Sequence, residues 1–200
     1  MAALKRLFSK NRKYNTLKRE TEARRLALIL EKHRIGYVLD VGANAGQTVE
    51  GLRRSGYLGK IISFEPIKQC HDELVAKSAA DPNWSIAPRC ALGDKDGSAE
   101  LLVSEGSSLS SINSPTEAMT QAMPKVRAAA REKVPIHRLD RLMKDEIAAA
   151  GGAFLKVDAQ GHDMKVLKGA EGIMGNISSA SRLRCPCSPS MKARRCIWTC

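Results

Sequence analysis

The sequence predicts an α/β fold with a mostly parallel sheet and flanking helices, and three observations lead to this prediction. Short apolar runs alternate along the chain with longer amphipathic segments, which is the pattern of repeated strand and helix units. The first run, YVLDV at residues 37–41, suits a parallel strand that is covered on both faces. Acidic residues mark the ends of three runs, at Asp40, Glu65 and Asp158. Ligands of such folds bind beyond the carboxyl ends of the strands.

The individual elements follow from periodicity and turn residues. We assign helices where apolar residues recur at helical spacing or where the length and charge pattern fit a helix. The expected helices are 16–33, 47–54, 67–79, an Ala- and Arg-rich stretch after residue 120, 139–150 and 163–174. Expected strands cover 37–41, 60–64, 84–92 with a bend at its proline, 98–103, 134–137 and 153–157. Turns are expected at 81–83 and 93–97. The serine-rich segment 105–120 is expected to form a loop over the site.

Composition indicates one globular domain with charged ends. The chain has 200 residues, of which 43% are hydrophobic and 27% charged, which is enough for a sizeable core. Its net charge of +12 is concentrated in residues 5–34 and 182–195, and such ends attract phosphate, nucleic acid or anionic membranes. No aromatic residues are interleaved there for base stacking, so we expect solvated tails and no specific nucleic-acid partner. The predicted regions are a basic tail with a helix at 1–34, a domain at 35–177 and a basic, cysteine-rich and disordered tail at 178–200.

The sequence predicts a cytoplasmic protein without a metal site. No apolar stretch reaches the roughly 20 residues of a transmembrane helix, and the N-terminus lacks the features of a signal peptide. Two cysteines are isolated in the domain, and the other four fall in the last 16 residues without the paired spacing or histidines of a structural zinc site. These cysteines are Cys70, Cys90, Cys185, Cys187, Cys196 and Cys200.

The turn after the first strand predicts an adenosine-type ligand. Gly42, Asn44 and Gly46 allow the backbone to approach a ligand closely, and the following helix directs its first N–H groups at the same place. Glu65 lies 19 residues after Gly46, where a carboxylate can accept both hydrogen bonds of a ribose diol. Helix capping is the alternative role for the strand-end acids Asp40 and Glu65.

The residues favour S-adenosylmethionine over NAD in this turn. The pattern Asp-x-Gly-x-Asn-x-Gly departs from the G-x-G-x-x-G that packs a helix N-terminus against a pyrophosphate, and a nearby acid would repel that group. Asp40 would instead attract the amino group and the sulfonium of S-adenosylmethionine, directly or through water. An NAD-dependent oxidoreductase is the alternative that a generic strand-turn-helix unit leaves open.

The sequence resembles the FkbM family of S-adenosylmethionine-dependent methyltransferases. The resemblance covers about Tyr37 to Met174, and its most specific part is the final block. The segments that carry the resemblance are VLDVGANAGQT, SFEP, CALGDKDG, HRLDRLM and FLKVDAQGHDMKVLKGAEGIM. The resemblance implies a Rossmann-like class I methyltransferase fold and S-adenosyl-L-methionine as cofactor. The implied reaction is O-methylation of a hydroxyl on a sugar or related natural product, so that the partner is a small-molecule or glycan acceptor.

The resemblance also implies roles for single residues. Those implied to bind the cofactor are Asp40, Gly42, Asn44 and Gly46 for the methyl donor, Glu65 for the ribose, and Ala91 and Leu92 for the adenine. Asp158 is implied to face the transferred methyl group and is the first candidate for a base or an orienting residue.

The residues that follow Asp158 include a second catalytic candidate and a turn. His162 can titrate near neutral pH and is the second catalytic candidate, although a lone histidine at a helix start is more often a surface or capping residue. Asp163 is interpreted as an acid at a helix N-terminus, and Gln160 and Gly161 as turn residues. The cluster 107–111 can hydrogen-bond a polyhydroxylated acceptor or stay solvated.

The resemblance fails after about residue 177. A class I methyltransferase continues with a fifth strand, another helix and an antiparallel hairpin, and we find no periodicity for any of them in 177–200. We therefore expect a truncated or frame-shifted end that leaves the strand 153–157 near a sheet edge. This expectation supports the second alternative, an incomplete and inactive domain that binds anions nonspecifically through its basic ends. The oligomeric state is not predicted.

Overall fold

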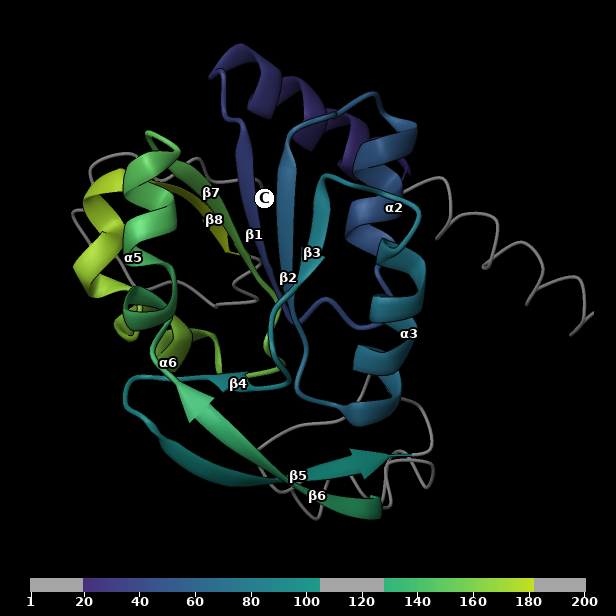
Figure 1. Cartoon of the computed structure of the whole chain (residues 1–200), viewed down its shortest axis with the longest axis vertical. Helices are drawn as coiled ribbons and strands as arrows, with labels where there is room; N and C mark the ends of the chain where they lie inside the picture. The colour runs from purple at the N-terminus through teal and green to yellow at the C-terminus, as the bar shows by residue number, and fades with distance from the viewer. Residues whose placement is uncertain (1–19, 105–127, 182–200) are drawn as a thin grey trace, which may run out of the picture.

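The structure is a computed structural model that describes residues 20–104 and 128–181, and Figure 1 gives the arrangement of its elements. Its helices are 20–32, α2 (Gln47–Arg54), α3 (Lys68–Ser78), α5 (Leu139–Ala149), α6 (Asp163–Lys168) and the 3₁₀ helix η3 (Glu171–Asn176). Its strands are β1 (Tyr37–Val41), β2 (Lys60–Phe64), β3 (Trp84–Ile86), β4 (Ala91–Leu92), β5 (Gly97–Ser104), β6 (Ala128–His137), β7 (Ala153–Val157) and β8 (Ile177–Ser181).

The main sheet is parallel throughout and has the strand order β3-β2-β1-β7-β8. The strand order reverses between β1 and β7, which lie side by side although more than 100 residues separate them in the chain. In this register Asp40 of β1 lies opposite Ser63 of β2 on one side and Lys156 of β7 on the other. The predicted α/β fold with a mostly parallel sheet is therefore confirmed.

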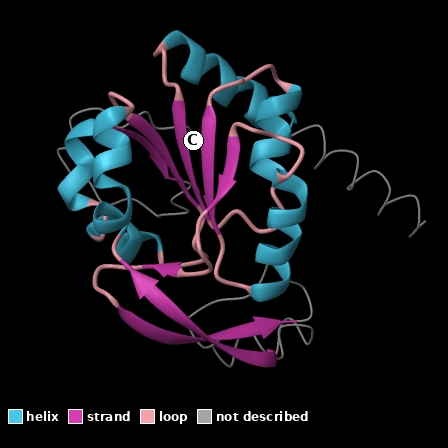
Figure 2. Cartoon of the chain, in the orientation of Figure 1, coloured by secondary structure: helices cyan, strands magenta, loops and turns pink. Residues whose placement is uncertain are grey.

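Helices cover both faces of this sheet, as Figure 2 shows. On one face, the buried side chains of β1 and β7, such as Val38 and Phe154, pack against the helix 20–32, α2 and α3. On the other face, their sequence neighbours Leu39 and Leu155 pack against α5, α6 and η3. Adjacent residues thus point to opposite cores, which explains why these strands are apolar without alternation.

The strand β8 corrects the analysis of the region after residue 177. Ile177 to Ser181 pair in parallel with Ala153 to Val157, so the expectation that no strand follows residue 177 is wrong, and β7 lies next to the edge strand β8 with a neighbour on both sides. The segment ISSAS has no apolar alternation, so its pairing with β7 could not be predicted from the sequence pattern. The strand crosses the boundary that we placed at residue 177, and the predicted regions are otherwise untested.

A second sheet of three strands, with the order β4-β6-β5, corrects two further predictions. The predicted strand 84–92 is two strands in different sheets, β3 beside β2 and β4 beside β6. The Ala- and Arg-rich stretch, predicted as helical, lies in β6 over its described part from Ala128. Antiparallel pairing with β5 supplies its hydrogen bonds and overrides its helix propensity. The predicted loop 105–120 lies outside the described residues.

The predicted helix 163–174 is interrupted at Gly169. A side chain at this position would place its Cβ 1.9 Å from the carbonyl oxygen of Gly93, so the backbone of α6 ends against the turn after β4. The carbonyl of Gly169 accepts a hydrogen bond from the N–H of Asp140 at 2.9 Å. Gly169 thus contacts the turn after β4 and the start of α5, and it lies between α6 and η3. Within the part of the chain that the structure describes, no helix is both long and apolar enough to cross a membrane.

Candidate functional site

A pocket of about 720 Å³, including its open mouth, lies where β1, β2 and β7 end, beside the second sheet. This position agrees with the rule for open parallel sheets, because it is at the carboxyl edge where the strand order reverses. Seven of the nine predicted site residues line it, and Asp40 and Gly46 do not. The seven are Gly42, Asn44, Glu65, Ala91, Leu92, Asp158 and His162.

Gly42 allows the ends of β1 and β7 to touch at the floor of the pocket. Its φ is +71°, and a Cβ built on it would lie 2.1 Å from the carbonyl oxygen of Asp158. The N–H of Gly42 donates to the carbonyl of Phe64 at 3.0 Å, and the N–H of Asp158 donates to the carbonyl of Val41 at 3.0 Å. The turn is thus fixed to both neighbouring strands, and no other residue type fits at its centre.

Asn44 and Gly46 shape the turn in different ways. Asn44 has a φ of +50° and directs its backbone N–H at a carboxylate oxygen of Glu65, 2.7 Å away. Gly46 has a φ of +85° and precedes α2, and a Cβ there would lie 2.8 Å from the ring of Trp84. Gly46 therefore packs the start of α2 against β3, which accounts for its absence from the pocket lining.

Glu65 is a buried carboxylate with hydrogen-bonding capacity left over. The residue is 4% exposed, and its two oxygens accept hydrogen bonds from the N–H groups of Asn44 and Ile67, at 2.7 and 3.0 Å. Burial raises the pKa of Glu65, and these two backbone hydrogen bonds oppose the rise. Each carboxylate oxygen can accept a further hydrogen bond, so the group can receive two neighbouring hydroxyls.

Asp40 lies beneath the pocket floor and is paired with a lysine that our sequence analysis did not identify. Its exposed fraction is 0%, and its Oδ1 lies 2.9 Å from the Nζ of Lys156. The same ammonium donates to the carbonyl of Gly42 at 3.1 Å. The signal for Lys156 was present in AFLKV, where a lysine interrupts an apolar strand. A contact between Asp40 and a ligand stays a prediction.

Asp158 and His162 occupy the connection from β7 to α6. Asp158 is half-buried, whereas His162 is 5% exposed and so is not the surface residue that its sequence position favoured. Burial and the nearby charge of Lys165 lower the pKa of His162, while Asp94 and Asp163 oppose that change. Burial thus disfavours the charged form of the imidazole.

The turn between these residues has the form that we predicted. Gln160 and Gly161 both have a positive φ, of +49° and +92°. Asp163 starts α6, and its carboxylate accepts hydrogen bonds from the N–H groups of Ala159 and Gly161, at 2.9 and 3.2 Å. These bonds fix the loop that carries the side chains of Asp158 and His162.

The described lining of the pocket has acidic side chains and lacks strongly basic ones. Among the described residues that line it, Glu65 and Asp158 are the carboxylates, and there is no lysine or arginine. Much of the remaining surface is apolar and includes Leu92 of β4 and Leu101 of β5. Sequence analysis missed Leu101 because only the second sheet brings it to the main sheet. Such a pocket suits a neutral or cationic ligand and disfavours a diphosphate.

The fold and the site define an open, parallel α/β protein with a ligand pocket at its strand-order reversal. A comparison with known protein families matches residues 40–183 to the Methyltransferase FkbM domain. The chain therefore belongs to the FkbM methyltransferase family, and the resemblance seen in its motifs is confirmed. Comparisons with the curated proteins and with the solved structures found no match.

Proposed function

We propose that the protein is an S-adenosylmethionine-dependent methyltransferase that methylates a hydroxyl of an uncharged acceptor, such as a sugar or a related natural product. The observation that carries the proposal is the acidic pocket, whose described lining has two carboxylates and no lysine or arginine. A sulfonium with an ammonium group matches this charge, whereas the pyrophosphate of NAD does not. Membership of the FkbM methyltransferase family supports the same conclusion.

The residues of the pocket fit the cofactor in its separate parts. Glu65 has two free acceptor positions for the ribose hydroxyls, and the buried strand β4, with Ala91 and Leu92, offers an apolar surface for the adenine. Gly42 and Asn44 line the pocket at the turn after β1, where we place the amino-acid end. Asp40 lies beneath the floor, where its carboxylate is paired with the ammonium of Lys156. S-adenosylmethionine, when bound, supplies a methyl group on a positively charged sulfur.

Two side chains can handle the proton of the acceptor hydroxyl. The carboxylate of Asp158 can accept a hydrogen bond from this hydroxyl, orient its oxygen and take its proton. The imidazole of His162 is the second candidate base, because it lines the same pocket and burial lowers its pKa, which disfavours its charged form. The apolar side chains of Leu101 and Val166, which line the same pocket, exclude water around the hydroxyl.

Isothermal titration of the purified full-length chain with S-adenosylhomocysteine and with NAD tests the proposal. We expect S-adenosylhomocysteine to bind and NAD not to bind. Binding of NAD without S-adenosylhomocysteine would overturn the proposal in favour of an oxidoreductase. Binding of neither would favour an inactive domain. Transfer of labelled methyl from S-adenosylmethionine to neutral and anionic sugars then tests the acceptor class, and we expect transfer to the neutral sugars.

A further inference from the structure

One lysine connects the buried acid of β1 to the backbone of the pocket floor. Lys156 and Asp40 face each other on neighbouring parallel strands, and their Nζ and Oδ1 atoms are 2.9 Å apart. The Nζ also donates to the carbonyls of Gly42 and Val41, at 3.1 and 3.4 Å. Both of these residues line the pocket, so the ammonium lies directly beneath it.

The ammonium of Lys156 lies close to two buried carboxylates, those of Asp40 and Glu65. Asp40 is 0% exposed, and neither of its oxygens has an aligned hydrogen bond to another described residue, so the charge of Lys156 is its main compensation. Glu65, 4% exposed, is affected by both groups: Lys156 lowers its pKa and Asp40 raises it, after the larger effects of burial and two backbone hydrogen bonds. Asp158, His162 and the thiol of Cys90 also line this pocket.

We propose that Lys156 is a positioning residue of the cofactor pocket, whose ammonium allows Asp40 and Glu65 to be ionised together beneath and beside the ligand. Without it, two buried carboxylates would share this site with no cation held against them. The pair would then bind a proton from solvent at a higher pH. Lys156 thereby keeps both carboxylates ionised and Glu65 available as an acceptor for the cofactor, and in this respect the inference rests on the proposed function.

The test measures S-adenosylhomocysteine affinity by isothermal titration from about pH 5 to pH 8.5, a range that covers raised carboxyl pKa values. Wild-type affinity should fall on the acid side as Glu65 is protonated. Lys156→Met should move this fall to higher pH by about one unit or more, since the compensating charge is lost. Asp40→Asn should move it to lower pH, since the charge that raises the pKa of Glu65 is lost. The other titratable residues that line the pocket, Asp158, His162 and Cys90, are unchanged in the wild type and in both variants.

Opposite shifts in the two variants support the inference. If the affinity falls at the same pH in all three proteins, the inference is overturned, even where a variant binds more weakly. Lys156 would then act through packing alone. If Lys156→Met does not fold, the Asp40→Asn shift decides in the same way: a lower pH supports the inference and an unmoved fall overturns it. Wild-type binding at neutral pH separately tests the proposed function.

Thermal unfolding without ligand tests the role of Lys156 independently of the proposed methyltransferase function. A buried carboxyl with a raised pKa stabilises the fold below its unfolded pKa of about 4, and this contribution is lost as the pH rises through the folded value. The Tm of Lys156→Met should therefore decrease toward neutral pH relative to that of the double variant Lys156→Met with Asp40→Asn. Parallel Tm curves for these two proteins would overturn the inference.

Discussion

Glu65 is the residue whose replacement should affect cofactor binding most directly. Glu65→Ala removes the acceptor that we assign to the ribose hydroxyls and also leaves the N–H groups of Asn44 and Ile67 without their partner. We expect binding of S-adenosylhomocysteine to weaken by about 1 to 3 kcal/mol, as for the loss of a hydrogen bond to a charged group. Isothermal titration measures this change.

The conservative variant Glu65→Gln is the control for this prediction. It keeps one acceptor oxygen and the side-chain volume, so its affinity should lie between those of the wild type and Glu65→Ala. Unchanged affinity in Glu65→Ala would remove Glu65 from the ribose site.

Gly42 tests the close approach of β1 and β7 at the pocket floor. Gly42→Ala would push a Cβ into the carbonyl of Asp158 at a φ of +71°, whereas Gly151, with a φ of +69°, has nothing within 4 Å of an added Cβ. We expect Gly151→Ala to cost about 1 to 2 kcal/mol from its backbone conformation alone. Gly42→Ala should cost about 1 to 3 kcal/mol more from the clash. Urea denaturation gives both values, and equal costs would contradict the contact.

Single residues of the site were predictable where their chemistry follows from strand-end position. Glu65 and Asp158 were identified because carboxyl ends of parallel strands meet at one edge, and both line the pocket. The pairing of Asp40 with Lys156 was not predictable, because it depends on the register of strands that are distant in the chain. Without that register, a lysine within AFLKV gives no indication of its partner.

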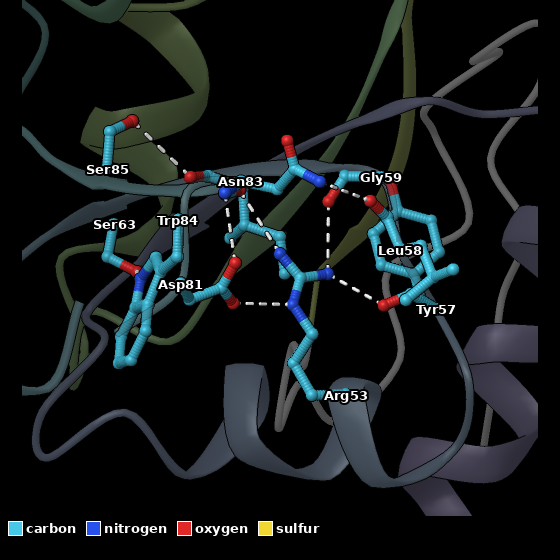
Figure 3. Close-up of polar contacts among 10 residues, drawn as sticks. Arg53, Tyr57, Leu58, Gly59, Ser63, Asp81, Asn83, Trp84 and Ser85 are labelled. Atoms are coloured by element: carbon cyan, nitrogen blue, oxygen red, sulfur yellow. Dashed lines mark hydrogen bonds and ion pairs between the residues drawn. The ribbon is translucent and has the colours of Figure 1, made fainter. Parts of the chain in front are cut away.

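At the scale of elements, Arg53 joins the end of α2 to two loops (Figure 3). Its guanidinium donates to the carbonyls of Tyr57, Gly59 and Asn83, at 2.7, 3.0 and 3.1 Å, and pairs with Asp81 at 2.7 Å. These partners precede β2 and β3, so one side chain aligns a helix with two strands of the sheet. It also lowers the pKa of the Asp81 carboxyl.

The neighbouring arginine provides a matched control for this junction. We expect Arg53→Met to lower the free energy of unfolding by about 2 to 4 kcal/mol, because several charged hydrogen bonds are lost. Arg54 is 62% exposed and its ion pair with Glu50 spans 3.9 Å, so Arg54→Met should change stability by about 0.5 kcal/mol or less. Urea denaturation of the two variants measures the difference. Similar values for both would show that Arg53 is not a structural link.

Which elements were predictable depends on whether their cause is local. The strands 37–41, 60–64 and 153–157 agree residue for residue with β1, β2 and β7, because each is an apolar run buried on two faces. The second sheet was not predictable as a unit, since β5 and β6 pair across a long separation in sequence. β8 was missed because its side chains carry no strand pattern and its pairing with β7 decides its structure.

At the scale of the whole molecule, the excess positive charge and the pocket residues belong to different parts of the sequence. The net charge of +12 is concentrated in residues 5–34 and 182–195, while the pocket is lined by two carboxylates and, among the described residues, by no lysine or arginine. Polyanions and a cationic cofactor should therefore bind by different mechanisms. This separation decides between an enzyme and a nonspecific anion binder.

Salt dependence tests this separation on the full-length chain. Affinity for a fluorescent DNA duplex, measured by anisotropy, should fall more than about tenfold between about 50 and 200 mM salt, because binding through the basic ends releases counterions. Affinity for S-adenosylhomocysteine, measured by titration calorimetry over the same range, should change by less than about threefold, because a buried pocket is poorly screened. A parallel, steep fall of both affinities would mean that the nucleoside binds to the basic ends. The acidic pocket would then not be the cofactor site, and the methyltransferase reaction would need another location in the chain.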